Sequence, residues 1–222
     1  MYTKNKKKME IIHTDLSFEV YKRLKTMILA NEFEPGEKLV QEQIAAMFGV
    51  SRMPLHKAFQ MLENEMLVEN LPRRGFYVTE IDNAKLLDAF ECREALEGIA
   101  ARRTTQVITE KELDDLKSLF KPFISKIKID IKKYIEADQA FHNSILQLSG
   151  NQILQKFEVV KNITSQTYRG GLIRQPEETL PEHLAIIDAI SKGDAQLAEQ
   201  LMREHSVKTQ ELIREQINKE KT

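Results

Sequence analysis

Hydrophobic residues in the first third of this chain recur at the three- and four-residue spacing of helices. Val20, Leu24 and Ile28 share one face, which predicts a first helix over residues 14–30. A short second helix then ends at Gly49, and a third begins almost at once. The apolar side of the third helix is formed by Leu55, Ala58, Phe59 and Leu62. Its opposite, polar side is therefore predicted to face solvent.

Two β-like runs follow at 66–71 and 76–79, and the Pro-Arg-Arg-Gly turn between them predicts a hairpin. After residue 82 the strand signal disappears, and helical spacing continues to the end. The predicted helices of this second part cover 83–105, 109–127, 130–149, 151–170, 178–192 and 194–218. The predicted fold is mainly α, with a winged helix-turn-helix over 1–81 and an all-α antiparallel helical bundle over 82–222.

The helix pair around Gly49 has the sequence of a helix-turn-helix. Glycine avoids side-chain crowding at the turn, Ser51 is a good N-cap, and Pro54 lies in the first turn, where backbone N–H groups lack intrahelical partners. The outward face that would enter the major groove carries Met53, His56, Lys57 and Gln60. Arg52, at the N-terminal end, is the strongest candidate for a base or phosphate contact, since a guanidinium can bond guanine O6 and N7 together.

The hairpin carries two adjacent arginines, Arg73 and Arg74, at its turn. A tip of this kind suits the negative potential of a narrow minor groove or the flanking phosphates. A helix pair with a charged outer face could instead be a solvated corner without any nucleic-acid partner. The ordered succession of capped helix, hairpin and two-arginine tip favours DNA binding over that alternative.

The segment 20–79 resembles the DNA-binding domain of the GntR family of bacterial transcription regulators. Pro35-Gly36, the Gly-Val-Ser-Arg run at 49–52, Pro54 and the turn at 72–75 carry the match in the family's order and spacing. The family usually has an Arg-Glu pair where this chain has His-Lys, a departure that concerns the operator sequence and not the docking mode. The residues expected to contact DNA are Ser51, Arg52, His56, Lys57, Arg73, Arg74 and Gly75.

Composition and charge limit the class of protein. With 222 residues, 41% hydrophobic and 30% charged, the chain can build two folded domains and is neither disordered nor fibrous. The formal net charge is -1, and residues 1–80 hold 12 Lys+Arg against 11 Asp+Glu. DNA binding would therefore depend on where the charges lie, with moderate affinity for nonspecific DNA.

The single cysteine and the hydropathy pattern concern the compartment. Cys92 excludes an intramolecular disulfide and a Cys-rich zinc finger, fits a reducing cytosol, and is expected to be a buried structural thiol. There is neither a signal-peptide core nor an apolar run long enough to span a bilayer. We expect a cytoplasmic protein without a membrane partner.

Four side chains in the second part have the types and positions of metal ligands. Asp138 and His142 are four residues apart, so they lie on one helix face about 6 Å apart along the axis. His183 follows near the start of a later helix, and His205 lies on the apolar side of the last helix. Three helices could bring these groups to one ion, although each histidine taken alone could equally be an unrelated core or surface residue.

The stretch 82–206 resembles the helical effector domain, called FCD, of the FadR-like branch of GntR regulators. In that branch an Asp-x3-His pair and two later histidines bind a divalent metal, and Asp138, His142, His183 and His205 match all four positions. The resemblance implies zinc or nickel, with manganese, cobalt or iron as alternatives, and a small organic acid effector whose carboxylate completes the coordination. Arg93, in a matching Arg-Glu-x-Leu-Glu stretch, could bind that carboxylate or form an internal salt bridge with the glutamate four residues on.

The expected function is a ligand-responsive transcription regulator, a repressor by analogy with the family, and not an enzyme. One recognition helix reads only a few base pairs, so a homodimer on a palindromic double-stranded operator is expected. One alternative is a metalloregulator that senses the ion itself. Another is a metal-dependent enzyme fused to a winged helix, since three histidines and a carboxylate could activate water. No motif places the base that such an enzyme would need.

Overall fold

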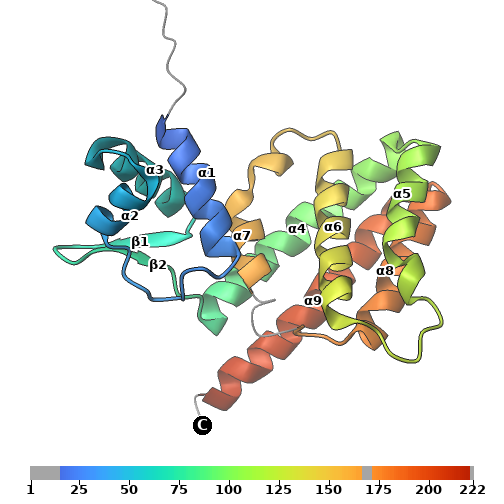
Figure 1. The fold of residues 1–222 in the computed structure, drawn as a ribbon. Coiled ribbons are helices and arrows are strands. Elements are labelled where there is room, and N and C mark those ends of the chain that lie inside the picture. Colours follow the sequence, from blue (N-terminus) through green and yellow to red (C-terminus); the bar gives the residue numbers. More distant parts are fainter. Residues whose placement is uncertain (1–15, 167–171, 221–222) are drawn as a thin grey trace, which may run out of the picture. The chain divides into compact units, whose positions relative to one another are not determined.

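The computed structural model describes residues 16–166 and 172–220, and within them it is mainly α-helical with one small sheet (Figure 1). The chain divides into two compact units, Met1–Thr79 and Glu80–Thr222. The sheet belongs to the first unit, and the described part of the second contains only helices and connecting turns. The mainly α fold, with a winged helix-turn-helix followed by a helical bundle, is thereby confirmed.

Three helices form the helical part of the N-terminal unit. The α2 helix ends at Gly49, whose φ of 65° is in the left-handed region that glycine adopts without a steric penalty. Ser51 is the N-cap residue of α3, as predicted, but its hydroxyl makes no capping hydrogen bond. Residues 14 and 15 of the predicted first helix lie outside the described part of the chain. The helices are α1 Leu16–Leu29, α2 Gln41–Phe48 and α3 Arg52–Asn64.

The predicted hairpin is present after α3. Strands β1 Val68–Leu71 and β2 Gly75–Val78 pair antiparallel. Lys38, in the segment before α2, forms an isolated antiparallel bridge to Tyr77 of β2. The chain before α2 therefore runs along the outer side of β2 at this position. The paired positions of the two strands are Val68 with Val78, Glu69 with Tyr77, Asn70 with Phe76 and Leu71 with Gly75.

A single hydrophobic core joins the helices of this unit to the hairpin. Phe59 of α3 stacks on Phe76 of β2, with ring centroids 4.6 Å apart. The apolar side of α3 is buried as the spacing predicted, so its polar side is the exposed one. The buried core residues are Val20, Tyr21, Leu24, Ile28, Leu39, Ile44, Leu55, Ala58, Phe59, Leu62, Leu67, Val68, Phe76 and Val78.

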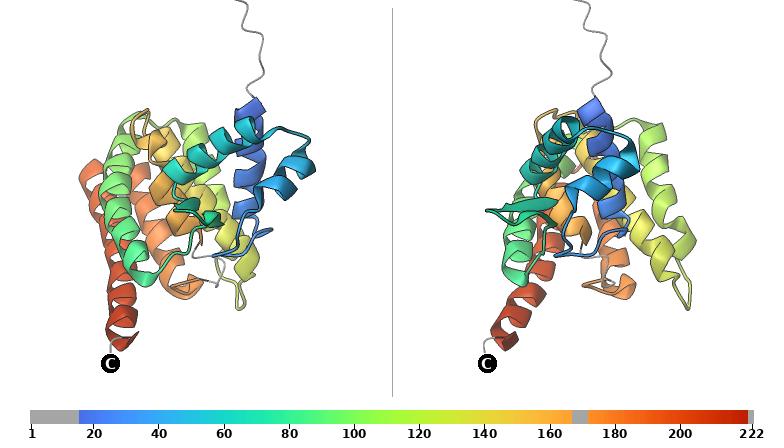
Figure 2. Two further views of the ribbon diagram at one scale, coloured as in Figure 1. Left: turned by 90° about the vertical axis from the view of Figure 1, so that its left-hand side faces the viewer. Right: turned by 60° about the vertical axis from the view of Figure 1, so that its left-hand side comes forward.

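Six α-helices form the described part of the second unit. The two longest, α4 and α9, lie side by side in both views of Figure 2 and have more contacts with each other than any other pair. They are antiparallel, since Asn83 at the start of α4 donates to Glu220 at the end of α9. The helices are α4 Asn83–Val107, α5 Glu110–Phe120, α6 Ile131–Leu148, α7 Glu158–Gln166, α8 Pro176–Ser191 and α9 Ala195–Glu220, with short 3-10 turns at Lys121–Phe123 and Leu154–Lys156.

Local capping groups determine where several of these helices begin. The carboxylates of Asp82 and Asp130 each accept a backbone N–H three residues further on, at the starts of α4 and α6. Thr109 and Glu112 form a reciprocal capping box at the start of α5. These signals are local in sequence, which explains why the predicted starts of these helices are accurate to within a residue.

Proline accounts for two differences between predicted and observed bounds. The helix predicted over 109–127 ends at Phe120, because Pro122 lacks the N–H that the next intrahelical bond requires. The α8 helix begins at Pro176, two residues earlier than predicted, because a missing N–H is harmless in the first turn. Pro181 lies inside α8 without ending it.

The helix predicted over 151–170 is wrong in its first part. The Asn151 side-chain oxygen accepts the backbone N–H groups of Ile153 and Leu154, which gives the chain a local alternative to helix. A 3-10 turn follows, and α7 begins only at Glu158. Residues 167–170 of that prediction lie outside the described part of the chain.

The core of the bundle is formed by apolar residues of α4, α5, α6, α8 and α9. Cys92 of α4 is exposed, which corrects the expectation of a buried thiol. None of the helices described here combines the length and apolarity that crossing a membrane requires. The buried core residues are Ala100, Ala101, Leu116, Phe120, Phe123, Tyr134, Ala137, Phe141, Ile145, Leu154, Ile186, Ile187, Ala189, Ile190, Ala198 and Met202.

Candidate metal centre and nucleic-acid interface

Three histidines from three helices meet inside the bundle. His142 comes from α6, His183 from α8 and His205 from α9, and one nitrogen from each lies within 4.8 Å of the other two. Asp138, one turn before His142, places its Oδ1 3.3 Å from His183 Nε2 and 3.9 Å from His142 Nε2. All four side chains are buried. The fold therefore brings together the complete set of four predicted ligand residues.

Two of the imidazoles are oriented by glutamates. His142 Nδ1 lies 2.7 Å from Glu97 Oε2 of α4, and His205 Nδ1 lies 2.7 Å from Glu182 Oε2 of α8. A carboxylate accepts a hydrogen bond from Nδ1–H, so each ring carries a hydrogen there, and in a neutral ring Nε2 then keeps its lone pair. This second layer of contacts is the usual support of metal-binding histidines.

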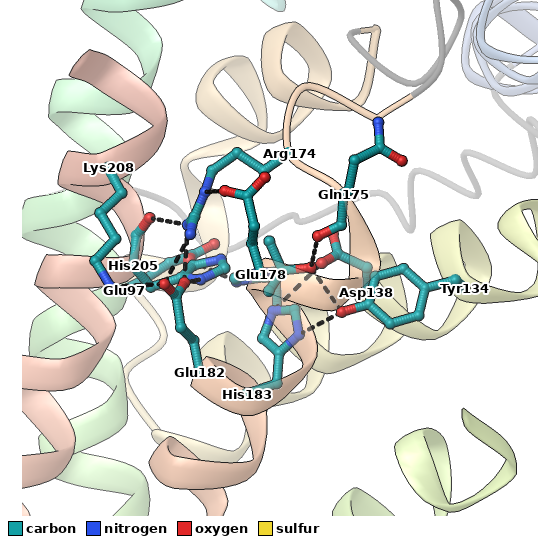
Figure 3. Close-up of polar contacts among 12 residues, drawn as sticks. Glu97, Tyr134, Asp138, Arg174, Gln175, Glu178, Glu182, His183, His205 and Lys208 are labelled. Carbon is teal, nitrogen blue, oxygen red and sulfur yellow. Dashed lines mark hydrogen bonds and ion pairs between the residues drawn. The ribbon is translucent and has the colours of Figure 1, made fainter. Parts of the chain in front are cut away.

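The third imidazole is oriented by a chain of hydroxyls, shown in Figure 3. The Thr179 hydroxyl donates to the backbone oxygen of Gln175 at 3.3 Å, so it accepts the Tyr134 hydroxyl at 2.7 Å. Tyr134 can then only accept from His183 Nδ1, 3.2 Å away. Burial raises the pKa of Tyr134, so this hydroxyl keeps its proton. The chain of donors assigns the His183 hydrogen to Nδ1 and leaves Nε2 facing Asp138.

The inward nitrogens lack hydrogen-bond partners. His142 Nε2 and His183 Nε2 are buried and make no hydrogen bond among the described residues. A buried nitrogen without a partner is unfavourable unless another group satisfies it. Burial lowers the pKa of His183 well below its usual value, helped by the neighbouring His205 and His142. Burial also lowers the pKa of His205, so these rings stay neutral, which is the form that binds metal.

The two orienting glutamates stay ionised because each is paired with a cation. Burial opposes ionisation of Glu97, but Arg93 and His142 outweigh it and lower its pKa to about 2. Burial likewise opposes ionisation of Glu182, and its bonds to His205, Arg174 and Lys208 lower its pKa well below the ordinary value. Both carboxylates can therefore accept hydrogen bonds from the imidazole N–H groups at neutral pH.

A small cavity of about 40 Å³ lies beside the histidines, with two buried arginines in its wall. Arg93 Nε donates to Glu97 Oε1 at 2.9 Å, which confirms the internal salt bridge that the sequence allowed. Arg174, for which the sequence suggested no role, binds both oxygens of Glu182 at 2.7 and 2.8 Å. The cavity is lined by Phe90, Arg93, Asp138, His142, Leu172, Ile173, Arg174, Thr179, His205 and Thr209.

The residues that sequence reasoning missed are those that support the ligands. The sequence relates Glu97 only to Arg93, and it indicates no role for Glu182 or Thr179. The sequence offered only weak signals for these roles. Glu182 directly precedes the candidate ligand His183, and Glu97 lies on the same helical stripe as Arg93. Their partners in the site lie 23 to 45 residues away along the chain, beyond the reach of any helical spacing.

The outward face of α3 carries the predicted recognition residues. Ser51, Arg52, His56 and Lys57 are all exposed, and the His56 ring contacts the edge of Phe76. The Arg52 side chain is 74% exposed and forms an ion pair with Glu42 of α2 at 2.9 Å. These positions leave the polar side of α3 free to approach a nucleic acid.

The tip of the hairpin presents its two arginines to solvent. Arg73 and Arg74 are exposed, and the Arg74 guanidinium lies 5.8 Å from the centre of the Tyr77 ring. Arg73 and Gly75 have φ values of 64° and 95°, in the left-handed region. Glycine is the residue that best tolerates this conformation, which explains its place directly after the arginines.

Comparison with known proteins adds independent information. Residues 16–78 match the family described as bacterial regulatory proteins, gntR family, and residues 88–207 match the FCD domain. The HTH-type transcriptional repressor RspR of Escherichia coli (strain K12) is 28% identical over 89% of this chain and 88% of its own length. An HTH-type transcriptional regulator from an unstable DNA locus of Streptomyces ambofaciens is 29% identical over 84% of this chain and 80% of its own.

Solved structures share the same fold. Escherichia coli McbR/YncC matches with a TM-score of 0.71 at 20% identity, covering 91% of this chain and 98% of its own. A GntR protein of Streptococcus agalactiae matches with a TM-score of 0.51 at 23% identity, covering 88% of this chain and 99% of its own. At these identities the similarity concerns the arrangement of helices and not the ligands.

Proposed function

Because the chain belongs to the GntR family of bacterial regulatory proteins and carries an FCD domain, it is a DNA-binding transcription regulator, and we propose that it is a metal-dependent, acid-responsive repressor. In this proposal the helical unit binds a divalent metal, and the metal helps to hold a small organic acid. The acid then changes the affinity of the winged helices for their operator.

The inward-facing imidazole nitrogens are the observation that carries the metal proposal. Two buried Nε2 atoms have no hydrogen-bond partner in the part of the chain that the structure describes, and each Nδ1 of the three rings has an oriented acceptor. Three imidazoles and the side chain of Asp138 suit zinc or nickel, with manganese, cobalt or iron as alternatives. A bound metal would supply a Lewis-acidic centre whose remaining positions can accept a carboxylate. His142, His183 and His205 would hold it with Asp138.

The cavity beside the histidines supports the effector proposal. Its volume of about 40 Å³ has room for a few water molecules or one carboxylate group. Arg93 and Arg174 lie in the same wall, and guanidinium groups recognise carboxylates well in buried sites. Arg93 already contacts Glu97 and Arg174 already contacts Glu182, so an effector carboxylate would share these guanidinium groups with the two glutamates.

The DNA-binding proposal places α3 in the major groove and the hairpin tip against the minor groove or phosphates. Arg52 would contact a base edge, with Ser51, His56 and Lys57 beside it and Arg73, Arg74 and Gly75 at the tip. Because one recognition helix covers only a few base pairs, we propose a homodimer on a palindromic site in double-stranded DNA. An effector that weakens operator binding must, by linkage, bind the DNA complex more weakly than the free protein.

A thermal-shift panel tests the metal and the effector together. Mono-, di- and tricarboxylates and sugar acids are added to metal-loaded protein and to chelated protein, because a ligand of the folded state raises the unfolding midpoint. An acid that acts only in the presence of metal supports the proposal. If no acid acts and operator affinity instead follows free metal, the protein is a metalloregulator. Turnover of an added acid would favour the metal-dependent enzyme.

A further inference from the structure

The arginine expected to read a base is already paired with a carboxylate on the neighbouring helix. Arg52, the first residue of α3, donates from one terminal NH₂ group to Glu42 Oε1 at 2.9 Å. Glu42 lies in the first turn of α2, and both side chains are mostly exposed, at 74% and 65%. The pair therefore lies on the face that the proposed docking turns toward DNA.

This ion pair has little structural value. Exposed pairs are screened by water and salt, and many contribute nothing measurable to folding. Both helices pack against the core through buried apolar residues, Ile44 in α2 and the apolar side of α3, and not through this pair. A carboxylate on a surface that approaches phosphates is also electrostatically unfavourable for DNA binding of any sequence. Its position thus calls for an explanation in terms of DNA recognition.

We infer that Glu42 is a positioning residue that directs Arg52 to a base edge and opposes binding to DNA of arbitrary sequence. This inference deepens the proposed function and rests on α3 entering the major groove. With Glu42 beside it, Arg52 carries no local excess charge to attract a phosphate. The same carboxylate restricts the long arginine side chain to one region of the surface, where its remaining donors can meet guanine O6 and N7.

The geometry leaves the guanidinium able to do this. Glu42 is the only hydrogen-bond or ion-pair partner of Arg52 within the described residues, and one oxygen accepts from one NH₂ group. The other terminal nitrogen and the second hydrogen of the bonded one stay available for a bidentate contact. Lys57 and the two hairpin arginines are exposed and can supply phosphate contacts in its place.

The charge balance of the N-terminal unit makes one carboxylate important. Residues 1–79 hold 12 Lys+Arg and 10 Asp+Glu, so no strong positive field masks a local negative charge. Removing the charge of Glu42 should therefore strengthen nonspecific binding measurably. It should also weaken the preference for a specific site, because Arg52 can then turn toward a phosphate.

The test uses the full-length protein, duplexes enriched from a randomised DNA pool by the unaltered protein, and a duplex of random sequence. Glu42→Gln keeps the size of the side chain and removes its charge. We expect this variant to bind the random duplex at least about threefold more tightly. The slope of log affinity against log salt concentration should become steeper by up to about 0.9, the value for one more phosphate contact. The ratio of specific to random affinity should fall. Glu63→Gln is the matched control, an exposed carboxylate about 17 Å along the axis of α3 from Arg52.

A double-mutant cycle separates positioning from simple charge removal. In an Arg52→Ala background, Glu42→Gln should no longer change the ratio of specific to random affinity. The inference is overturned if Glu42→Gln leaves both affinities unchanged, if Glu63→Gln has the same effect, or if the effect on the ratio persists without Arg52. If the unaltered protein enriches no sequence at all, the proposed function fails as well, which is a separate and recognisable result.

Discussion

Replacing Tyr134 by phenylalanine removes one oxygen atom from the support of the candidate metal centre. The hydroxyl is fully buried, accepts from His183 Nδ1 at 3.2 Å and contacts Thr179 Oγ1 at 2.7 Å. Without it, the His183 Nδ1 hydrogen has no acceptor in the described surroundings. The imidazole can recover a partner by moving its hydrogen to Nε2, which faces Asp138 Oδ1 at 3.3 Å. That tautomer cannot bind a metal through Nε2.

The two states of the protein should therefore respond differently to Tyr134→Phe. In the metal-free protein the loss is limited to one buried polar group, about 1–3 kcal/mol at most and less if the ring changes tautomer. Metal affinity should fall by about 10- to 100-fold, the effect typical of losing a group that orients a metal-binding histidine. Denaturant unfolding with chelator measures the first quantity, and a competitive zinc or nickel titration measures the second.

A second tyrosine provides the control. Tyr77→Phe removes a hydroxyl from the wing, in the other unit, and should change neither quantity appreciably. Unchanged metal affinity in Tyr134→Phe would refute the assignment of the His183 tautomer. A loss of stability as large with metal as without it would show that the hydroxyl acts on the fold alone.

The remaining predictions use the same two assays and DNA binding. Arg52→Ala should abolish specific DNA binding while leaving fold and metal content intact; an unchanged fluorescence titration against an enriched duplex would contradict it. His142→Ala combined with His205→Ala should remove the metal, measured by elemental analysis, and make the unfolding midpoint insensitive to chelator. The pKa values of His183 and His205 in the folded protein lie below the usual 6.5, so the unfolded chain binds protons more readily than the folded one. The free energy of unfolding of the metal-free protein should therefore be fully present above pH 6.5 and decrease below it. A flat pH profile would argue against neutral buried rings. Phe141→Ala, at a fully buried position, should cost about 3–5 kcal/mol in denaturant unfolding, and a loss under 1 kcal/mol would contradict its place in the core.

The candidate site could be predicted in part because two of its ligands are local neighbours. The i, i+4 spacing of Asp138 and His142 and the inward face of His205 follow from helical periodicity alone. The grouping of His183 and His205 with this pair came from the family resemblance, since spacing cannot relate residues on separate helices. The exposed face of α3 that we propose for DNA binding was predictable for the same reason as the first pair, because α3 has a clear apolar side.

The amino-acid sequence by itself determined the order of the helices, the hairpin and the faces that are buried, since these depend on periodicity, caps and turns within a few residues. It also determined the chemical types of the ligands. Only the tertiary structure decided that Glu97 and Glu182 orient the imidazoles, that Arg174 joins the cavity wall, and that Glu42 pairs with Arg52. Those contacts depend on which surfaces of separate helices pack together, and packing depends on the fit of the whole core rather than on local spacing.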